Sequence, residues 1–436
     1  MKSNLKRFQF APLAKLFFYA FIFCLPFNVN LIVYTSSVYS TGILNTYSSF
    51  FIYFNDFLLV FSLLFWAIAI FKKEYTEEIR YGNPFIFLLL MFLLVAAEIS
   101  VFFAKDSVLS ILIVIRFFEF SVLYFVIQNK IVSLQTIVNV FIASVSFQAL
   151  LAVMQFLVQG ALSLQFLGES VISPQTLGVA KIDLVNDTIL RPYGTFPHSN
   201  ILAGYLVVSI LFTYFKVLKK EQIAMPLLLL QIGALILTFS RTAFLALIIS
   251  WFIYISIKNT KIPYKLILLI LTSIILFVVV FNLENLIYSR LLFTDISSLN
   301  ERVFYFNLGK AVLYTVPFGV GIGNFTLIMQ DFTNIKIAPW DFQPVHNIYM
   351  LIANEIGIHG FIIFLAVLIV CGVYLFKKMK KSHNEQKQFN TILICTLSAY
   401  IVLGMFDHYL FSLYQGLALT YLLFGIYGRS LIEENR

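Results

Sequence analysis

The sequence predicts an all-α polytopic membrane protein with about twelve transmembrane helices, and three observations support this fold class. Hydrophobic residues make up 60% of the chain and charged residues only 12%, so a soluble fold could not cover its surface with polar groups. Many apolar runs approach the ~20 residues that carry a helix across a bilayer. The runs are continuous, as at 266–281, whereas strands of a membrane barrel would alternate apolar and polar residues. Because lipid satisfies no backbone hydrogen bond, helices are expected.

We expect a single transmembrane domain over residues 1–436. The first apolar run follows basic residues, but no small-residue cleavage site comes after it, so it is interpreted as a retained helix rather than a signal peptide. The expected spans are 13–33, 50–71, 84–104, 108–128, 134–158, 199–217, 224–240, 242–257, 264–282, 346–376, 389–406 and 409–428.

The positions of Lys and Arg orient these spans. Most of the 30 basic residues fall on one side when the N-terminus is placed in the cytoplasm, and cytoplasmic segments carry the excess of basic residues. Both termini are therefore expected to be cytoplasmic. The net charge of +9 belongs to short loops between spans, so a nucleic-acid partner is rejected. Two long loops remain outside, 159–198 and 283–345, and the second is expected to contain an amphipathic helix.

The chemistry is therefore expected at the outer face of the cell inner (plasma) membrane, toward the periplasm or the cell exterior. The outer segments hold Arg191, Arg241, Arg290 and Arg302, whereas the inner loops are mostly Lys. Arginine grips phosphate or carboxylate with a planar fork, while lysine acts as a point charge. This asymmetry predicts an outer surface that holds an anion.

The three cysteines predict neither a disulfide nor a zinc site. Cys24, Cys371 and Cys395 all lie inside apolar runs, without CxxC or Cys/His spacing.

Two arginines flank expected helix ends. Arg191 lies in a loop just before a span; proline and glycine at 192–197 make the entry turn-like, and Ser199 or Asn200 can cap the helix that follows. Arg241 lies in a tight outer hairpin that has no other charge. Each arginine has two interpretations: an interfacial anchor, or a ligand for an anion at the membrane edge.

A third segment, 301–325, is interpreted as an amphipathic helix that ends in a glycine-rich turn. Its GxGxG string at 319–323 is not a dinucleotide motif, because it follows no strand of a βαβ unit and faces outside. Backbone freedom at a turn is the simpler explanation of the glycines. Arg302 can bind an anion or pair with Glu301.

His346 and Asn347 stand at the outer start of the long tenth span. Histidine is the usual general base near neutral pH, although it is also a common interfacial polar residue. In the same span, Gly357 and Gly360 share one helix face, where small residues allow helices to pack closely.

Three further polar sites have two interpretations each. Arg116 is expected inside the membrane, where arginine is costly and usually functional, but Glu119 at i+3 can neutralise it. Asp407 and His408 form the outer turn between the last two spans, where they either cap the turn or join the site.

From the His-Asn segment onward, the sequence resembles the O-antigen ligase and O-antigen polymerase superfamily of bacterial membrane glycosyltransferases. That family has H, then N, S or Q, nine residues, G, two residues and G, which this chain matches in full. The resemblance extends over roughly 110–425 in order and spacing. The first hundred residues match only in hydropathy, and the large extra domain of some members is absent. The matching residues are His346-Asn347 with Gly357 and Gly360, Arg191 with Gly194-Thr195-Phe196 and Asn200, Ser240-Arg241, and Arg302 with Pro317-Phe318-Gly319.

The resemblance implies inverting transfer of a glycan from a polyprenyl (undecaprenyl) pyrophosphate carrier, in lipopolysaccharide or other surface polysaccharide biosynthesis. The acceptor would be a lipid, another glycan or a protein hydroxyl, so ligase and polymerase both remain open. No cofactor is expected. No metal is expected either, because the outer loops lack an Asp-x-Asp pair and an arginine cluster can neutralise the leaving pyrophosphate. The expected roles are a base or acceptor-orienting group at His346, a pyrophosphate clamp of Arg191 and Arg241 with Arg302 and Arg116 as further candidates, and support from Asn347, Asn200 and His408.

Two other classes remain. A transporter or flippase for lipid-linked glycans also commonly has twelve spans, but such proteins usually place coupling residues near the midplane within repeated halves. No repeat is evident here. A non-catalytic membrane scaffold would make changes to the outer arginines and histidines silent.

Overall fold

The computed structural model describes residues 9–37, 44–75, 78–129, 131–183, 188–258 and 296–431. The expected ninth span, 264–282, and Arg290 lie outside these ranges.

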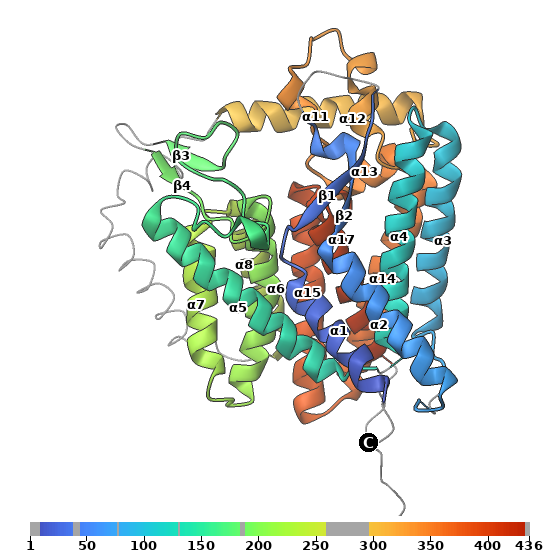
Figure 1. Cartoon of the computed structure of the whole chain (residues 1–436), viewed down its shortest axis with the longest axis vertical. Helices are drawn as coiled ribbons and strands as arrows, with labels where there is room; N and C mark the ends of the chain where they lie inside the picture. Colours follow the sequence, from blue (N-terminus) through green and yellow to red (C-terminus); the bar gives the residue numbers. More distant parts are fainter. Residues whose placement is uncertain are drawn as a thin grey trace, which may run out of the picture.

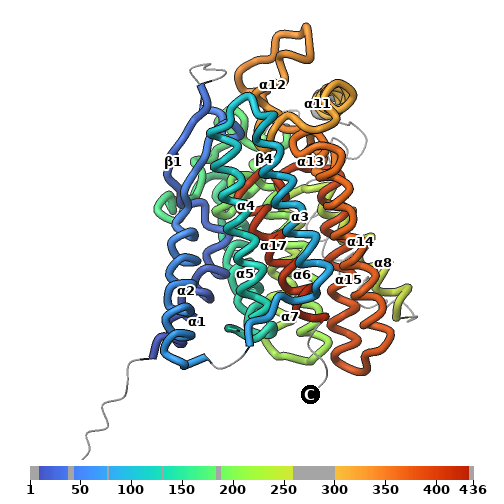
Figure 2. The backbone as a smooth tube through the Cα atoms, turned by 90° about the vertical axis from the view of Figure 1, so that its right-hand side faces the viewer, coloured from blue at the N-terminus to red at the C-terminus, as the bar shows by residue number. Residues whose placement is uncertain are grey.

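The fold is a bundle of long helices that run between two ends (Figure 1). A further helix, α11 (Ile296–Thr315), lies across one of these ends in both views, and we call it the α11 end (Figures 1 and 2). The start of α1 and the end of α17 both lie at the opposite end. The long helices are α1 (Ala11–Cys24), α2 (Phe54–Phe71), α3 (Pro84–Ser100), α4 (Ser107–Gln128), α5 (Leu134–Val158), α6 (Ser199–Leu218), α7 (Ala224–Leu237), α8 (Arg241–Lys258), α14 (Ile358–Lys381), α15 (Asn384–Phe406) and α17 (Tyr414–Ser430).

Within the described residues, eight helices are long and apolar enough to cross a membrane: α2 to α6, α8, α14 and α15. The helices α1 and α7 are apolar but shorter, at 14 residues each. A mostly helical membrane protein is therefore confirmed, whereas the structure does not establish the count of twelve spans or the orientation of the termini.

Short capping residues define where several helices begin. Asn83 accepts hydrogen bonds from two backbone amides at the start of α3, and Pro84 occupies its first turn, where no amide donor is needed. Asp106 caps α4 through the amide of Leu109, and Ser133 caps α5. These local polar residues satisfy the amides that a helix leaves unpaired at its N-terminus.

The prediction of a helix over residues 13–33 is wrong in its second half. The helix α1 ends at Cys24, and the chain then becomes the strand β1 (Asn30–Thr35) instead of staying helical to residue 33. Pro26 lies two residues after Cys24, and proline has no amide hydrogen to donate to the carbonyl four residues earlier, so the helix does not continue through it. The strand pairs antiparallel with β2 (Ser49–Tyr53), which satisfies its backbone groups.

The prediction of an all-α fold also needs a correction, because the structure contains two short β-hairpins. A second hairpin joins β3 (Lys181–Asp183) to β4 (Thr188–Leu190) in the loop before α6. The remaining short elements are η1 (Thr46–Ser48), η2 (Val101–Phe103), η3 (Gln165–Leu167), α12 (Phe325–Ile328), η4 (Met329–Phe332), η5 (Pro339–Asp341), α13 (Ile348–Glu355) and α16 (Tyr409–Ser412).

Two further spans are broken rather than continuous. The tenth, 346–376, divides into α13 and α14 at Gly357, whose φ of 95° and ψ of 172° lie in a region that is essentially reserved for glycine. The twelfth, 409–428, divides into α16 and α17 at Leu413, which is extended. Each break is short and lies within a longer apolar run, so a hydropathy window averages over it.

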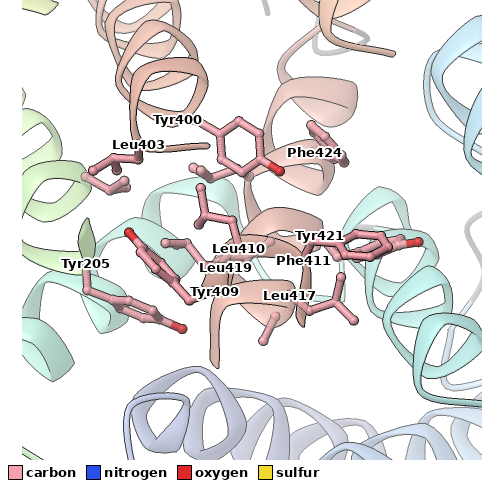
Figure 3. Close-up of a cluster of buried hydrophobic side chains, with 14 of the residues drawn as sticks. Tyr205, Tyr400, Leu403, Tyr409, Leu410, Phe411, Leu417, Leu419, Tyr421 and Phe424 are labelled. Atoms are coloured by element: carbon pink, nitrogen blue, oxygen red, sulfur yellow. The ribbon is translucent and has the colours of Figure 1, made fainter. Parts of the chain in front are cut away.

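The centre of the bundle consists of α6 and α17, whose side chains are almost all buried. Figure 3 shows aromatic side chains from α6, α15, α16 and α17 meeting there, among them Tyr205, Tyr400 and Tyr409. The hydroxyl of Tyr205 donates to the carbonyl of Gln415 at 2.7 Å. A Cβ on Gly416 would lie only 1.9 Å from the Tyr409 carbonyl oxygen, so α16 packs directly on the start of α17. This packing fixes the turn that precedes α16.

Candidate active site

Polar side chains from separate motifs meet at the α11 end of the bundle. The guanidinium of Arg191, in the loop after β4, donates from Nε to the Thr238 carbonyl at 2.6 Å and from Nη2 to Asn200 Oδ1 at 2.7 Å. Thr238 lies in the turn between α7 and α8, and Asn200 in the first turn of α6. Arg191 therefore ties the loop to two helix ends.

The network continues through Asn200 to the turn before α16. Asn200 Nδ2 donates to Asp407 Oδ2 at 3.2 Å, and Asp407 Oδ1 lies 3.8 Å from His346 Nδ1. The last distance is that of an ion pair and is too long for a hydrogen bond. A continuous path, Arg191–Asn200–Asp407–His346, therefore connects the first expected motif to the fourth. We call it the relay.

Asn347 fixes the position of His346. Its Oδ1 accepts from the amide of Met350 and caps α13, while its Nδ2 donates to the carbonyl of Met405 at 3.0 Å. Met405 lies in the last turn of α15, two residues before Asp407. The Asn347 side chain thus holds the start of α13 against the turn that carries the carboxylate.

Three of the five histidines of the chain gather here. The rings of His346 and His408 lie 5.1 Å apart between centroids, and His408 Nδ1 is 2.7 Å from Ser412 Oγ. His198 caps α6 by accepting the amide of Asn200 at Nδ1. Aromatic rings enclose the histidines: Tyr47 meets His408 edge-on at 5.2 Å, and Tyr305 of α11 meets His346 at 6.0 Å.

Electrostatics separate the roles of these groups. Burial alone would raise the pKa of Asp407, but the adjoining His346 and the other two histidines outweigh it and hold that pKa well below its usual range. Burial, with smaller contributions from nearby positive charges that include Arg302, lowers the pKa of His198 to about 4 and that of His408 to about 3. Asp407 is therefore a carboxylate, and His198 and His408 are neutral, at neutral pH.

The arginines differ in how many hydrogen bonds and ion pairs they form with other protein groups. Arg302 of α11 is close enough to act on both neutral histidines, and within the described residues it has no ion pair, with Glu301 or any other acid. Arg241 begins α8, three residues after Thr238; it is exposed, and no ion pair is found for it among the described residues. Within the part of the chain that the structure describes, no carboxylate therefore neutralises either guanidinium.

Arg116 lies in a different environment. It donates to Asp56 Oδ1 at 2.6 Å and to the Phe51 carbonyl at 2.7 Å, and it also pairs with Glu119. The Tyr414 ring lies 4.7 Å from the guanidinium carbon. Two acidic side chains already pair with this guanidinium, as one of the two interpretations of the sequence anticipated for Glu119.

The glycine string packs against the break between α13 and α14. The amides of Val320 and Gly321 donate to the carbonyls of Asn354 and Glu355 at 2.9 and 3.0 Å. Gly321 has a φ of 92°, and a Cβ on Gly319 would lie 2.6 Å from the Glu355 carbonyl oxygen. The string therefore has a structural role that couples the third motif to the fourth, which agrees with the simpler explanation.

The sequence did not assign several members of this site. For Asp407 the sequence allowed two interpretations, a turn cap or a member of the site. It predicted neither the approach of Asp407 to His346 nor the capping of α6 by His198. Tyr47 and Tyr305 come from segments that carried no motif. The available signal was the scarcity of histidine: His198, His346 and His408 each stand at an expected outer helix end.

Three side chains of this site lie close enough together to be considered as metal ligands. One donor atom each from His346, Asp407 and His408 lies within 4.8 Å of the others. However, Asp407 already accepts from Asn200 and from the His408 amide, and His408 Nδ1 is engaged with Ser412. The donor set is thus largely committed to protein hydrogen bonds.

Residues 226–365 match a family model described as O-antigen ligase, a segment that includes Arg241, Arg302 and the His346–Gly360 motif. A search of the curated proteins finds no match.

Proposed function

We propose that the protein transfers a glycan from a polyprenyl pyrophosphate carrier to an acceptor hydroxyl, and the match of residues 226–365 to the O-antigen ligase family model supports this proposal. The family supports a membrane glycosyltransferase of this general kind. The relay supports the specific chemistry together with Arg241 and Arg302, for which no ion pair is found among the described residues, because a base and cations for an anionic leaving group are then both at hand.

His346 is the proposed base. Its Nδ1 faces Asp407, which leaves Nε2 to take the proton of the acceptor hydroxyl. The hydroxyl oxygen forms a bond to the anomeric carbon while the bond from that carbon to the phosphate oxygen breaks, and the electron pair leaves with the pyrophosphate. A single displacement of this kind inverts the anomeric centre. The Asp407 carboxylate stabilises the imidazolium that forms.

Arg241 and Arg302 are the proposed groups that neutralise the departing pyrophosphate. Arg191 holds the relay in place and is the proposed third member of the clamp. Arg116 is left out of the clamp, because Asp56 and Glu119 already use its charge. In this mechanism guanidinium groups do the work of a metal ion, and the reaction proceeds without one.

We propose that the site faces the periplasm or the cell exterior from the cell inner (plasma) membrane, so that the carrier lipid stays in the bilayer while the glycan reaches the α11 end. An O-antigen ligase-like reaction, with a lipid or protein acceptor, is the favoured type. A polymerase would use a second lipid-linked glycan as acceptor. The same assay separates the two.

The test is a reconstituted transfer assay. Purified protein in proteoliposomes receives lipid-linked glycan and candidate acceptors in the presence of EDTA, and products are resolved on a gel. Wild type is expected to form product, His346→Ala to form none, and His383→Ala to match wild type because that exposed histidine lies at the start of α15, far along the chain from every motif. Normal turnover by His346→Ala would remove the base from the mechanism, and a ladder on the carrier lipid would indicate a polymerase.

A further inference from the structure

His198 lines a cavity beside the relay and also caps a helix. The cavity has a volume of about 750 Å³, and its wall includes the β1–β2 hairpin, the loops 170–179 and 339–344 and the start of α17. His198 is the only histidine among its described lining residues, and the side chain is partly exposed. Capping α6 uses only one of the two ring nitrogens, so the second nitrogen needs an explanation of its own.

The hydrogen bond at Nδ1 determines which nitrogen carries the ring hydrogen. His198 Nδ1 accepts the amide hydrogen of Asn200 at 3.1 Å, so Nδ1 presents a lone pair. In a neutral imidazole the hydrogen is then on Nε2, which becomes a donor. Nε2 has no hydrogen-bond partner among the described residues, and it is not one of the unpartnered atoms that the fold seals from solvent, such as Tyr421 Oη. A molecule in the cavity can therefore accept from Nε2.

The ring donates without carrying a charge. Burial and, to a smaller extent, nearby positive charges that include Arg191 and Arg302 lower the pKa of His198 to about 4, so the ring is neutral at neutral pH. Both guanidiniums are therefore close enough to act on the ring, and both belong to the proposed clamp. An anion held by these arginines would lie beside the Nε2 hydrogen.

A neutral donor beside cations suits a reaction that releases an anion. Its hydrogen bond to an oxygen strengthens as negative charge develops on that oxygen, which stabilises the transition state more than the ground state. A further full positive charge would also attract the separated pyrophosphate and slow its release. The neutral ring thus supplies a directed hydrogen bond and leaves charge neutralisation to the arginines.

We propose that His198 donates a hydrogen bond from Nε2 to a phosphate oxygen of the leaving pyrophosphate, as an uncharged member of the anion site. The hydrogen stays on Nε2, so no proton is transferred in this contact and His346 remains the base of the mechanism. The inference rests on the proposed function and deepens it by adding a donor that no sequence motif indicated.

Two substitutions separate the cap from the donor. In His198→Asn the side-chain oxygen can still accept the Asn200 amide, because asparagine is a preferred capping residue, but no group reaches the position of Nε2. In His198→Gln the longer side chain brings its amide nitrogen near that position, and the cap is weakened. A residue that only caps α6 would tolerate asparagine better than glutamine in every measurement, whereas a donor to the anion reverses this order for binding and turnover.

Binding of inorganic pyrophosphate is measured by isothermal titration calorimetry on the full chain in nanodiscs, together with thermal unfolding. His198→Asn is expected to unfold at the wild-type temperature and to bind pyrophosphate about tenfold more weakly, as the loss of a hydrogen bond to a charged group predicts. His198→Gln is expected to unfold at a lower temperature and to bind more tightly than His198→Asn. The matched control is Ser133→Ala, which removes the cap of α5 outside the cavity wall and should lower the unfolding temperature without changing binding.

Binding by His198→Asn within about threefold of wild type overturns the inference. Equal weakening in His198→Asn and His198→Gln overturns it as well, and so does a wild type that does not bind pyrophosphate. In the transfer assay, kcat/KM for the lipid-linked glycan should fall about tenfold to hundredfold in His198→Asn, and an unchanged value contradicts the contact with the leaving group.

The two proposals fail in different ways. A wild type that binds pyrophosphate through His198 but transfers no glycan to any acceptor would contradict the proposed function and leave the anion donor in place. Transfer that proceeds normally in His198→Asn would overturn the donor and leave the proposed function in place.

Discussion

Replacing Asp407 by asparagine removes the charge that faces His346 and keeps the shape of the side chain. One oxygen remains to accept from Asn200 or from the His408 amide, so the turn before α16 is expected to fold. What the variant loses is stabilisation of the imidazolium that forms when His346 takes the acceptor proton. The ground state, in which that ring is not yet charged by the reaction, is affected less.

The magnitude follows from the geometry. At the 3.8 Å between Asp407 Oδ1 and His346 Nδ1, two unit charges attract by about 4 kcal/mol for an effective dielectric constant near 20. That energy corresponds to at most ~10³-fold in rate. We expect kcat to fall by at least ~10²-fold, with KM for donor and acceptor nearly unchanged.

The assay is steady-state transfer in proteoliposomes, with thermal unfolding as a check on the fold. The matched control is Asp331→Asn, which removes a carboxylate from an exposed pair with Lys105 and is expected to leave kcat unchanged. A folded Asp407→Asn variant whose kcat stays within about threefold of wild type would refute the role of the carboxylate.

Three further predictions concern the fold, pH and the clamp. Gly357→Ala is expected to destabilise the protein by at least about 2 kcal/mol, because its new Cβ would lie 2.5 Å from the Phe318 carbonyl oxygen at a φ of 95°. Thermal unfolding measures this loss. The control is Gly233→Ala, whose Cβ would meet nothing within 4 Å. The pKa of His408 is about 3 in the folded protein against 6.5 ordinarily. As the pH drops, the unfolded chain therefore binds the proton first, so the stability of the fold should fall between about pH 6.5 and 3. A His408→Asn variant should lose less stability over this range, and an equal dependence of stability on pH in both proteins would contradict this. Arg302→Ala should raise KM for the donor by about tenfold and reduce inhibition by inorganic pyrophosphate; unchanged inhibition would place the anion elsewhere.

The local sequence predicted most of the long helices, because the apolar character of a segment depends only on its own residues. Continuous apolar runs identified segments such as α4 and α15, and the motif residues Arg191, Asn200 and His346 do meet in space. The structure leaves their chemical roles to experiment. Their meeting depends on the order and direction of the spans, which hydropathy and the distribution of basic residues already constrain.

The breaks could not be predicted in this way. A hydropathy window averages over the α13–α14 junction, where a glycine with positive φ interrupts the helix within a longer apolar run. The strand β1 was missed for a related reason, because its residues are as apolar as a span and differ only in pairing with β2 across a distance of about 20 residues. Pro26 was the local signal for that change.

The relay itself depends on tertiary contact. Asp407 and His346 are 61 positions apart in sequence. Asp407 lies in the turn before α16, and His346 directly precedes Asn347, the residue that caps α13. Nothing in either segment indicates the other, so the carboxylate stayed ambiguous. Arg116 was ambiguous in the same way until Asp56, from another helix, appeared as its second acidic partner.

The most direct test of the central claim counts both products of one turnover. Wild type and His346→Ala in proteoliposomes receive radiolabelled lipid-linked glycan, an acceptor and EDTA, and the glycosylated acceptor and the released polyprenyl pyrophosphate are quantified together. We predict equal amounts of the two products from wild type and neither from His346→Ala. Glycan that crosses the bilayer still attached to its carrier, with no pyrophosphate released, would contradict the account and indicate a transporter.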